Sequence, residues 1–184
     1  MKRCWNTDKP LYIKYHDEEW GVQVHDDRKL FEFLVLDAFQ AGLTWWLILQ
    51  RRDIIRKAFE NFDPNKIAQF TTKDVSHILT IPGMIKNKAK ISATITNAHQ
   101  FLAIQKEYGS FDKFIWKFVN EKTITHSFHE LSELPAQSQE SIEMSKELKK
   151  RGFKFVGPTI CYSFMQAAGL VNDHLIDCFR YKQL

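Results

Sequence analysis

The sequence predicts an all-α protein, and three features of its pattern indicate that class. Hydrophobic residues recur at spacings of three and four through most of the chain, which is the period of a helix with one buried face. The alternation that is typical of strands does not persist over any long segment. Gly, Pro and helix-capping residues interrupt the helical pattern at short intervals, so we expect short connections between the helices.

The first predicted helix runs from Asp27 to about Ala41 and has hydrophobic residues on one face. Gly42 is expected to end this helix, and Thr44 is expected to cap a second helix from Trp45 to Lys57. Leu43 therefore lies on a tight corner between two helices.

Helical patterns continue along the rest of the chain. Asp63-Pro64 opens a short helix, and another covers Asp74 to Leu79. The segment IPGMIKNKAK, residues 81–90, is a hairpin-like break before a long amphipathic helix. The last three predicted helices lie around 111–119, 141–150 and 158–169.

The length and composition suit one globular domain over residues 1–184. The segment 63–103 and the two chain ends could form separate lobes, but no Ser- or Gly-rich linker lies between them, so we expect one core. Hydrophobic residues make up 44% of the chain and charged residues 26%, which is ordinary for such a domain. The formal net charge of +4 permits an anionic partner without requiring one.

The sequence also suggests a compartment. The opening MKRCWNTDKP lacks the apolar core of a secretory signal, and no apolar run is long enough to cross a bilayer. The three cysteines are odd in number and far apart, so they do not form a disulfide framework. We therefore expect a cytoplasmic protein in a reducing environment.

Two cysteines and two histidines near the chain ends could bind a metal. They are Cys4, His16, His174 and Cys178. The last two are four residues apart, so one helical turn would let both reach one ion, and two Cys with two His make a closed zinc shell. From spacing alone, a zinc site that joins the termini and two unrelated pairs are equally supported, because Cys4 and His16 are farther apart than zinc-finger ligands.

Aromatic residues are dense near the start of the chain. The stretch CWNTDKPLYIKYHDEEWG contains Trp5, Tyr12, Tyr15 and Trp20, and no regular period fits their positions. Flat rings suit stacking on a planar ligand such as a nucleobase. Core packing is the commoner fate of aromatic residues, and composition alone favours it.

One acid, Asp37, lies in the otherwise apolar stretch FLVLDAFQAGLTWWLIL. On a helix it shares a face with Gln40. A carboxylate in an apolar wall must be hydrogen-bonded or paired, or it takes up a proton. Asp37 therefore either lines a pocket or is a partly exposed acid that pairs with a lysine.

The break at residues 81–90 is rich in lysine. Lys86, Lys88 and Lys90 follow the bend at the start of a helix, where exposed amides and the helix dipole can hold a phosphate. The segment KKRGFKF, residues 149–155, adds a second basic cluster. Taken alone, this pattern is more often a solvated helix face.

Several long blocks of the chain resemble one family. CWNTDKPLYIKYHDEEWG, QAGLTWWLILQRR, RGFKFVGPTICYSFMQAAGLVNDH and the trailing Cys178 are closely similar to the DNA-3-methyladenine glycosylase I family, and the resemblance runs from end to end. It implies a helix-hairpin-helix DNA glycosylase with a structural zinc that joins the N- and C-terminal segments. Such a monomeric enzyme hydrolyses the N-glycosidic bond of 3-methyladenine in double-stranded DNA and leaves an abasic site.

The resemblance also implies where these functions lie. The helix-hairpin-helix covers about 72–104, and the zinc-binding terminal region is formed by about 1–25 and 158–184. The implied zinc ligands are Cys4, His16, His174 and Cys178. Tyr15 and Trp45 match the aromatics that stack on a flipped base, and Trp5, Tyr12 and Trp20 match other walls of the pocket.

The implied DNA contacts fall on two turns. Gly42 and Leu43 match the corner that enters the duplex where the base has left. Pro82 and Gly83, with Lys86 and Lys88, match the hairpin that grips the DNA backbone. That hairpin has one glycine where many relatives outside the family have two, so we expect its amides to contact phosphate in a different way.

The sequence departs from the family at Asp37, where the family usually has Glu in contact with the methylated base. Asp is one methylene shorter, so the contact needs a helix shift, a bridging water or another lesion orientation. Because N3 methylation makes the base a good cationic leaving group, we expect Asp37 to recognise the base and stabilise charge, not to act as a general base. The alternatives are a non-catalytic, zinc-stabilised module that binds damaged DNA or a base, and a family member with shifted lesion specificity.

Overall fold

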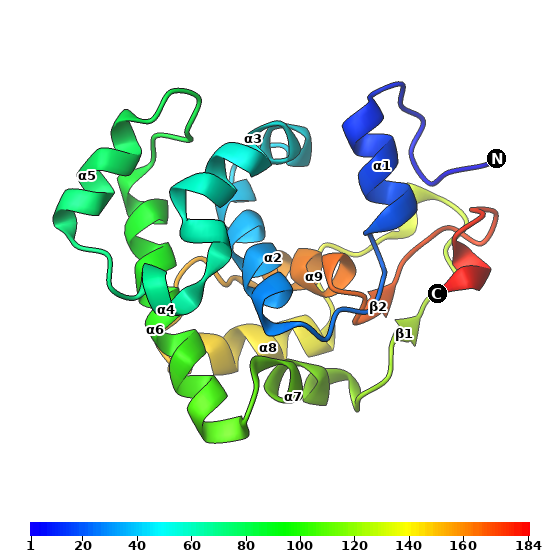
Figure 1. Ribbon diagram of the computed structural model, residues 1–184. Coiled ribbons are helices and arrows are strands. Elements are labelled where there is room, and N and C mark those ends of the chain that lie inside the picture. Colours follow the sequence, from blue (N-terminus) through cyan, green and yellow to red (C-terminus); the bar gives the residue numbers. More distant parts are fainter.

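The computed structural model describes residues 1–184, and it is almost entirely helical (Figure 1). Its α-helices are α1 (Pro10–Glu18), α2 (Asp27–Gln40), α3 (Trp45–Ala58), α4 (Pro64–Ile67), α5 (Thr72–Thr80), α6 (Lys88–Tyr108), α7 (Phe111–Trp116), α8 (Gln139–Lys150) and α9 (Pro158–Ala167). Short 3₁₀ helices cover Glu60–Phe62, Lys117–Val119, Leu131–Glu133 and Tyr181–Gln183. None of the helices is both long and apolar enough to traverse a bilayer.

Local caps explain where the main helices begin. The Asp26 side chain accepts a hydrogen bond from the Lys29 amide at 2.8 Å, which caps α2. Thr44 caps α3 in the same way, and Asn87 caps α6. At α5 a capping box is complete, because the Asp74 side chain in turn accepts from the amide of the N-cap residue. These boundaries follow from interactions within a few residues, and they lie close to the predicted ones.

Helix α2 occupies the middle of the molecule, next to α3, α6, α7 and α9 (Figure 1). Ten of its 14 residues are buried, and they include the acids Glu32 and Asp37. Of the buried hydrophobic residues, 42 form one cluster that extends from Cys4 to Cys178. Asp37 is therefore an interior residue, and the alternative of a partly exposed acid is wrong.

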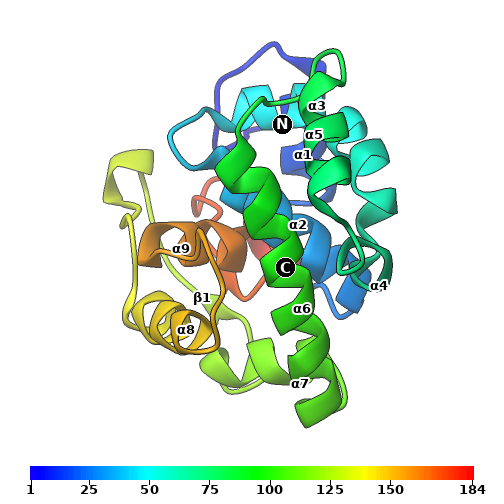
Figure 2. The same ribbon diagram turned by 90° about the vertical axis from the view of Figure 1, so that its left-hand side faces the viewer.

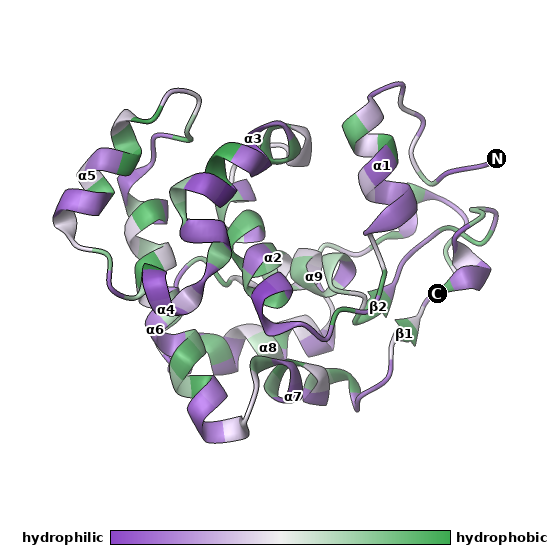
Figure 3. Ribbon diagram, viewed as in Figure 1, coloured by the Kyte–Doolittle hydropathy of each residue, from purple (hydrophilic) through white to green (hydrophobic).

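Helix α5, at the outside of the molecule, shows one apolar face. In Figure 3, hydrophobic and hydrophilic residues lie on different sides of α5, as expected for a helix that packs on a core through one face. Helix α6 is seen along most of its length in Figure 2, with the α5–α6 connection at its N-terminal end. Its packing partners include α2, α4, α5 and α7.

Helix α1 and the two short strands have no counterpart in the prediction. Helix α1 buries only Tyr15 and His16, so its residues lack the apolar spacing by which helices are recognised. Strands β1 (Ile124–Thr125) and β2 (Val171–Asn172) pair in parallel, with Ile124 opposite Val171. Two residues are too few for an alternating pattern, and the pair forms only because the tertiary fold brings these segments together.

Candidate active site and metal centre

A cavity of about 200 Å³ lies between α1, α2, α3 and α9. This volume is below the ~300–1,000 Å³ of sites for drug-sized ligands and suits a single base. Its lining residues are Trp5, Tyr12, Tyr15, Trp20, Asp37, Gln40, Trp45, Leu134, Ser163 and Gln166. All five aromatic residues predicted to form a pocket, together with Asp37, thus line one cavity.

The aromatic walls come from separate parts of the chain. The Trp5 and Tyr15 rings are nearly parallel, with an interplanar angle of 8° and centroids 6.3 Å apart. Trp45, at the start of α3, lies with its ring centroid 5.1 Å from that of Tyr15. Trp20 packs on Trp5 at 4.8 Å. The cavity is therefore bordered by flat, electron-rich surfaces.

Asp37 is the only charged residue in the lining, and it has no partner. The side chain is 1% exposed, and its buried Oδ2 atom makes no hydrogen bond. Burial raises the pKa of Asp37 well above its ordinary value. A second buried polar atom without a partner, Trp45 Nε1, belongs to the same cavity. Because such atoms cost about 1–3 kcal/mol each, the pair indicates a site completed by a ligand.

The other buried acid of α2 shows what Asp37 lacks. Glu32 accepts hydrogen bonds from Arg52 Nε and Arg56 Nη2, both at 2.8 Å. Burial alone would raise the pKa of Glu32, but these pairs and Lys29 lower it. No cationic side chain lines the cavity around Asp37. The fold thus pairs the buried carboxylate of Glu32 with arginines and leaves that of Asp37 available to a ligand.

Four lining residues were not predicted as site residues, and of these Gln40 was expected only to share a helix face with Asp37. Ser163 and Gln166 are three residues apart on α9, so they lie on one face of that helix. Their signal was present as polar residues in an otherwise apolar helix. Leu134 follows the 3₁₀ helix Leu131–Glu133, and nothing in its local sequence indicates a pocket wall.

The predicted corner adjoins this cavity. Gly42 has φ +75°, and the amide of Leu43 donates to Gln40 O at 2.6 Å, so the chain turns sharply between α2 and α3. Leu43 is 37% exposed, which is unusual for a large apolar side chain next to the core. The corner lies between the helix of Asp37 and the N-terminus of the helix of Trp45, and it therefore presents an apolar residue near the cavity.

The predicted hairpin lies between α5 and α6. Gly83 has φ +79°, a conformation that favours glycine, and a Cβ there would lie 2.7 Å from Ile54 Cδ1 on α3, so the Ile54 side chain would have to move. Pro82, Lys86 and Lys88 are exposed. Lys90 is not: only 5% of it is exposed, which removes it from the lysine cluster proposed to bind phosphate.

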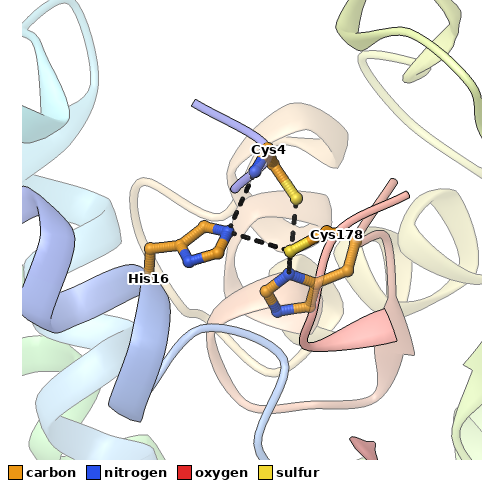
Figure 4. A group of neighbouring side chains, drawn as sticks. Cys4, His16 and Cys178 are labelled. Carbon is orange, nitrogen blue, oxygen red and sulfur yellow. Dashed lines mark hydrogen bonds between the residues drawn. The ribbon is translucent and has the colours of Figure 1, made fainter. Parts of the chain in front are cut away.

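Cys4, His16, His174 and Cys178 form a second site. All four are buried, and one potential ligand atom from each lies within 4.8 Å of the other three. Figure 4 shows the Cys4, His16 and Cys178 side chains pointing toward one another. His174 Nδ1 is 3.4 Å from both sulfur atoms. Spacing left this set undecided, and the fold brings it together.

The hydrogen bonds of the two imidazoles fit metal binding. His174 Nε2 lies 2.9 Å from Trp20 O, a pure acceptor, so this nitrogen carries the proton and the Nδ1 lone pair faces the cluster. His16 Nδ1 donates to the Asp17 carboxylate at 2.8 Å, which leaves Nε2 for the cluster. Arg3 in turn holds Asp17 through two hydrogen bonds that end on Oδ2. Both rings are thereby oriented by partners outside the ligand set.

Acid–base properties of the cluster agree with this geometry. Burial lowers the pKa of His174 to about 4 and also lowers the pKa of His16, so both rings are neutral at pH 7. Burial raises the pKa of the Cys4 thiol to about 12. A divalent ion would replace the thiol protons, and the donor set of two sulfurs and two nitrogens fits tetrahedral Zn²⁺.

An aromatic cavity with an unpaired acid, an exposed apolar residue on a corner and a basic hairpin are together typical of enzymes that act on a base taken out of a duplex. Comparison with known proteins gives the family. A family model described as methyladenine glycosylase matches residues 5–181, and the chain therefore belongs to the methyladenine glycosylase family.

Named relatives match over nearly their whole length. The chain is 47% identical over 182 residues to DNA-3-methyladenine glycosylase 1 of Escherichia coli, which covers 98% of this chain and 97% of that protein. It is 46% identical to DNA-3-methyladenine glycosylase of Haemophilus influenzae, with 96% of each covered. The protein is accordingly an enzyme of the glycosylase class.

Solved structures agree with the fold. A crystal structure of 3-methyladenine DNA glycosylase I superimposes with a TM-score of 0.94 at 47% identity and covers 97% of this chain and 98% of that one. The 3-methyladenine DNA glycosylase I of Staphylococcus aureus, solved to explain 3-methyladenine recognition, gives 0.94 at 37% identity, with 97% and 95% covered. The mostly helical fold is thus shared with these enzymes.

Proposed function

We propose that this protein is a monofunctional DNA glycosylase that hydrolyses the N-glycosidic bond of 3-methyladenine in duplex DNA and leaves an abasic site. The observation that carries the proposal is the unpaired, buried Asp37 in an aromatic cavity without a cation. A pocket of this kind favours a flat guest that brings a positive charge or hydrogen-bond donors. A flipped 3-methyladenine nucleotide, whose base is cationic, has both properties.

The aromatic rings and Asp37 both favour a positively charged base in the cavity. Each desolvated ring face that meets the cationic base can contribute about 1–2 kcal/mol. Burial disfavours the ionised form of Asp37 and raises its pKa. A cationic base beside it favours the ionised carboxylate, which can then accept a hydrogen bond from the base directly or through a water. Neutral adenine offers no such charge, so the pocket discriminates against it.

The reaction needs little further help from the protein. As the C1′–N9 bond breaks, its electron pair moves to the base, which leaves as neutral 3-methyladenine. Positive charge moves to the sugar, a water oxygen bonds to C1′, and the water proton passes to solvent. We assign Asp37 to recognition and to electrostatic stabilisation of this charge. We assign Tyr15 and Trp45 to stacking, with Trp5, Tyr12 and Trp20 as the other walls.

Two exposed turns would hold the DNA. The corner Gly42–Leu43 would place the Leu43 side chain in the space that the flipped base leaves, which keeps the duplex open. The hairpin around Pro82-Gly83 leads to the N-terminus of α6, where free amides favour a phosphate. The exposed ammonium groups of Lys86 and Lys88 would add to that contact without reading the sequence.

We propose that Cys4, His16, His174 and Cys178 bind a structural Zn²⁺. The ion would join the N-terminal segment to the C-terminal one and take no part in the reaction. Cys4 precedes Trp5, and His16 follows Tyr15, so two ligands are adjacent in sequence to two pocket walls. The metal would therefore also keep these aromatic rings in place.

The activity can be tested on DNA treated with a methylating agent. The protein is incubated with this duplex DNA, and released bases are identified by chromatography while abasic sites are counted separately. We expect equal amounts of free 3-methyladenine and abasic sites. Tight binding without release would refute catalysis and favour a binding module. Strand breaks that exceed the background hydrolysis of abasic sites would refute a monofunctional reaction.

A further inference from the structure

Lys90 connects the DNA-gripping hairpin with the helix of Asp37. It belongs to the first turn of α6, where its amide donates to the side chain of the N-cap residue Asn87 at 3.1 Å. Its side chain runs inward to the end of α2. There Nζ donates to Phe39 O at 2.7 Å and to Ala41 O at 2.5 Å. One residue thus contacts the termini of two helices.

The chemistry of this contact is specific. The last carbonyl groups of a helix have no partner within the helix and carry the negative end of its dipole. A buried ammonium group satisfies two such acceptors here, and each charge-assisted bond is stronger than a neutral one. The two carbonyls flank the point where the chain leaves α2 and enters the corner at Gly42 and Leu43. The ammonium is therefore beneath the corner.

The contact also limits how the corner can move. On one side, the amide of Leu43 donates to Gln40 O, and on the other side Lys90 holds the carbonyl of Ala41. Asp37 lies one helical turn before Ala41 on the same helix. A shift of α6 relative to α2 would therefore move the corner and the acid together.

We propose that Lys90 is a positioning residue that couples the phosphate-binding end of α6 to the Leu43 corner. When the hairpin binds the DNA backbone, this coupling sets how far the Leu43 side chain enters the duplex. This inference rests on the proposed function, because it assumes that Leu43 enters the duplex. Lys90 itself does not contact DNA, since its ammonium group is buried and bonded to protein carbonyls. Without it, α2 loses its C-terminal partner and the corner is free to shift.

The test compares Lys90→Met with Lys106→Met, a matched control on an exposed lysine of the same helix. Single-turnover excision from methylated DNA is measured at saturating protein, together with affinity for a duplex that contains a stable abasic-site analogue. We expect Lys90→Met to slow excision about tenfold or more, which corresponds to one lost charge-assisted hydrogen bond, and to change duplex affinity less. Lys106→Met should change neither quantity.

Leu43 insertion is read directly with 2-aminopurine placed next to the abasic-site analogue. Wild-type protein should unstack the probe and increase its fluorescence, Lys90→Met should reduce that increase, and Lys90→Arg should restore most of it. A purely structural role of Lys90 would lower the melting temperature without changing the fluorescence of the bound, folded protein. Wild-type insertion amplitude in folded Lys90→Met would overturn the proposal.

A double-mutant cycle keeps the proposal testable if one variant is unstable. If Lys90 acts through the corner, its substitution should slow excision much less in a Leu43→Gly background than in the wild type. Equal losses in both backgrounds would overturn the coupling, and Lys90→Gln, which also lacks the charge, can replace Lys90→Met in the cycle if the latter does not fold. If wild-type protein releases no 3-methyladenine, the proposed function fails instead. Lys90 is then judged by the insertion signal alone.

Discussion

Replacing Asp37 by Asn should make the protein more stable and less active. The buried carboxyl has no hydrogen-bond partner at Oδ2, and burial raises its pKa above that of the unfolded chain. The folded protein therefore holds a proton here at pH values where the unfolded chain, with a carboxyl pKa near 3.9, has lost it. Stability from this group is fully present below about pH 4 and falls as pH rises toward the folded pKa. Asn resembles the protonated acid in shape and does not titrate.

The size of the effect follows from proton linkage. Between the unfolded and the folded pKa, the wild-type protein loses up to about 1.4 kcal/mol per pH unit relative to Asp37→Asn. For a protein of this size, 1 kcal/mol changes the melting temperature by about 2–4 °C. The melting temperature of Asp37→Asn should thus gain about 3–6 °C on the wild type for each pH unit in that range and then level off. Scans by circular dichroism from pH 5 to 8 measure this difference.

Glu32→Gln on the same helix is the matched control and should have the opposite sign. It removes the buried carboxylate that Arg52 and Arg56 share and leaves them only Glu19 and Asp53 as partners, so the melting temperature at pH 7 should fall. In the same preparations, Asp37→Asn should slow release of 3-methyladenine by about 10–100-fold, since it removes a charged hydrogen-bond partner of the base. A melting temperature for Asp37→Asn that is lower at pH 7, or a difference independent of pH, would refute the reasoning.

Three more predictions concern the metal, the corner and the hairpin. Cys178→Ser should lose bound zinc and destabilise the protein by on the order of 4 kcal/mol, whereas Cys161→Ser, at a buried cysteine outside the cluster, should keep its zinc. Zinc content is measured by plasma emission analysis and stability by thermal melts. Unchanged zinc in Cys178→Ser would contradict the ligand assignment. Leu43→Ala should slow excision from duplex DNA by about tenfold or more. It should leave the affinity for free 3-methyladenine, measured by calorimetry, unchanged. Weaker binding of the free base would show that Leu43 belongs to the pocket. Replacing Lys86 and Lys88 by Ala should reduce the slope of log Kd against log salt concentration by about 2, and an unchanged slope would exclude both from phosphate contact.

The sequence predicted the helices best where local signals were complete. Asp63-Pro64 and the cap at Thr44 act through hydrogen bonds within a few residues, so they are visible in the chain itself. Helix α1 has Pro10 at its first position but no side-chain cap, and its buried residues are only Tyr15 and His16, which face a cavity and the Cys/His cluster instead of an apolar core. Its helical form is supported by tertiary contacts.

The site was predicted in part for a similar reason. Asp37 and Gln40 share a helix face, and both line the cavity. Leu134 lies in a loop whose sequence has no period, and only its position across the cavity makes it a wall. Lys90 was grouped with Lys86 and Lys88 by spacing, but the direction of its side chain depends on where α2 ends.

The sequence by itself determined which chemical groups this protein possesses: an acid without a local partner, flat rings, two Cys and two His, and the caps that begin several of the helices. Only the tertiary structure decided that the rings and the acid share one cavity, that four distant ligands lie within reach of one ion, and that one lysine of three is buried. The physical reason is range. Capping and periodicity are interactions between near neighbours in the chain, whereas burial, and with it the protonation state of Asp37, depends on segments that packing brings together from far apart.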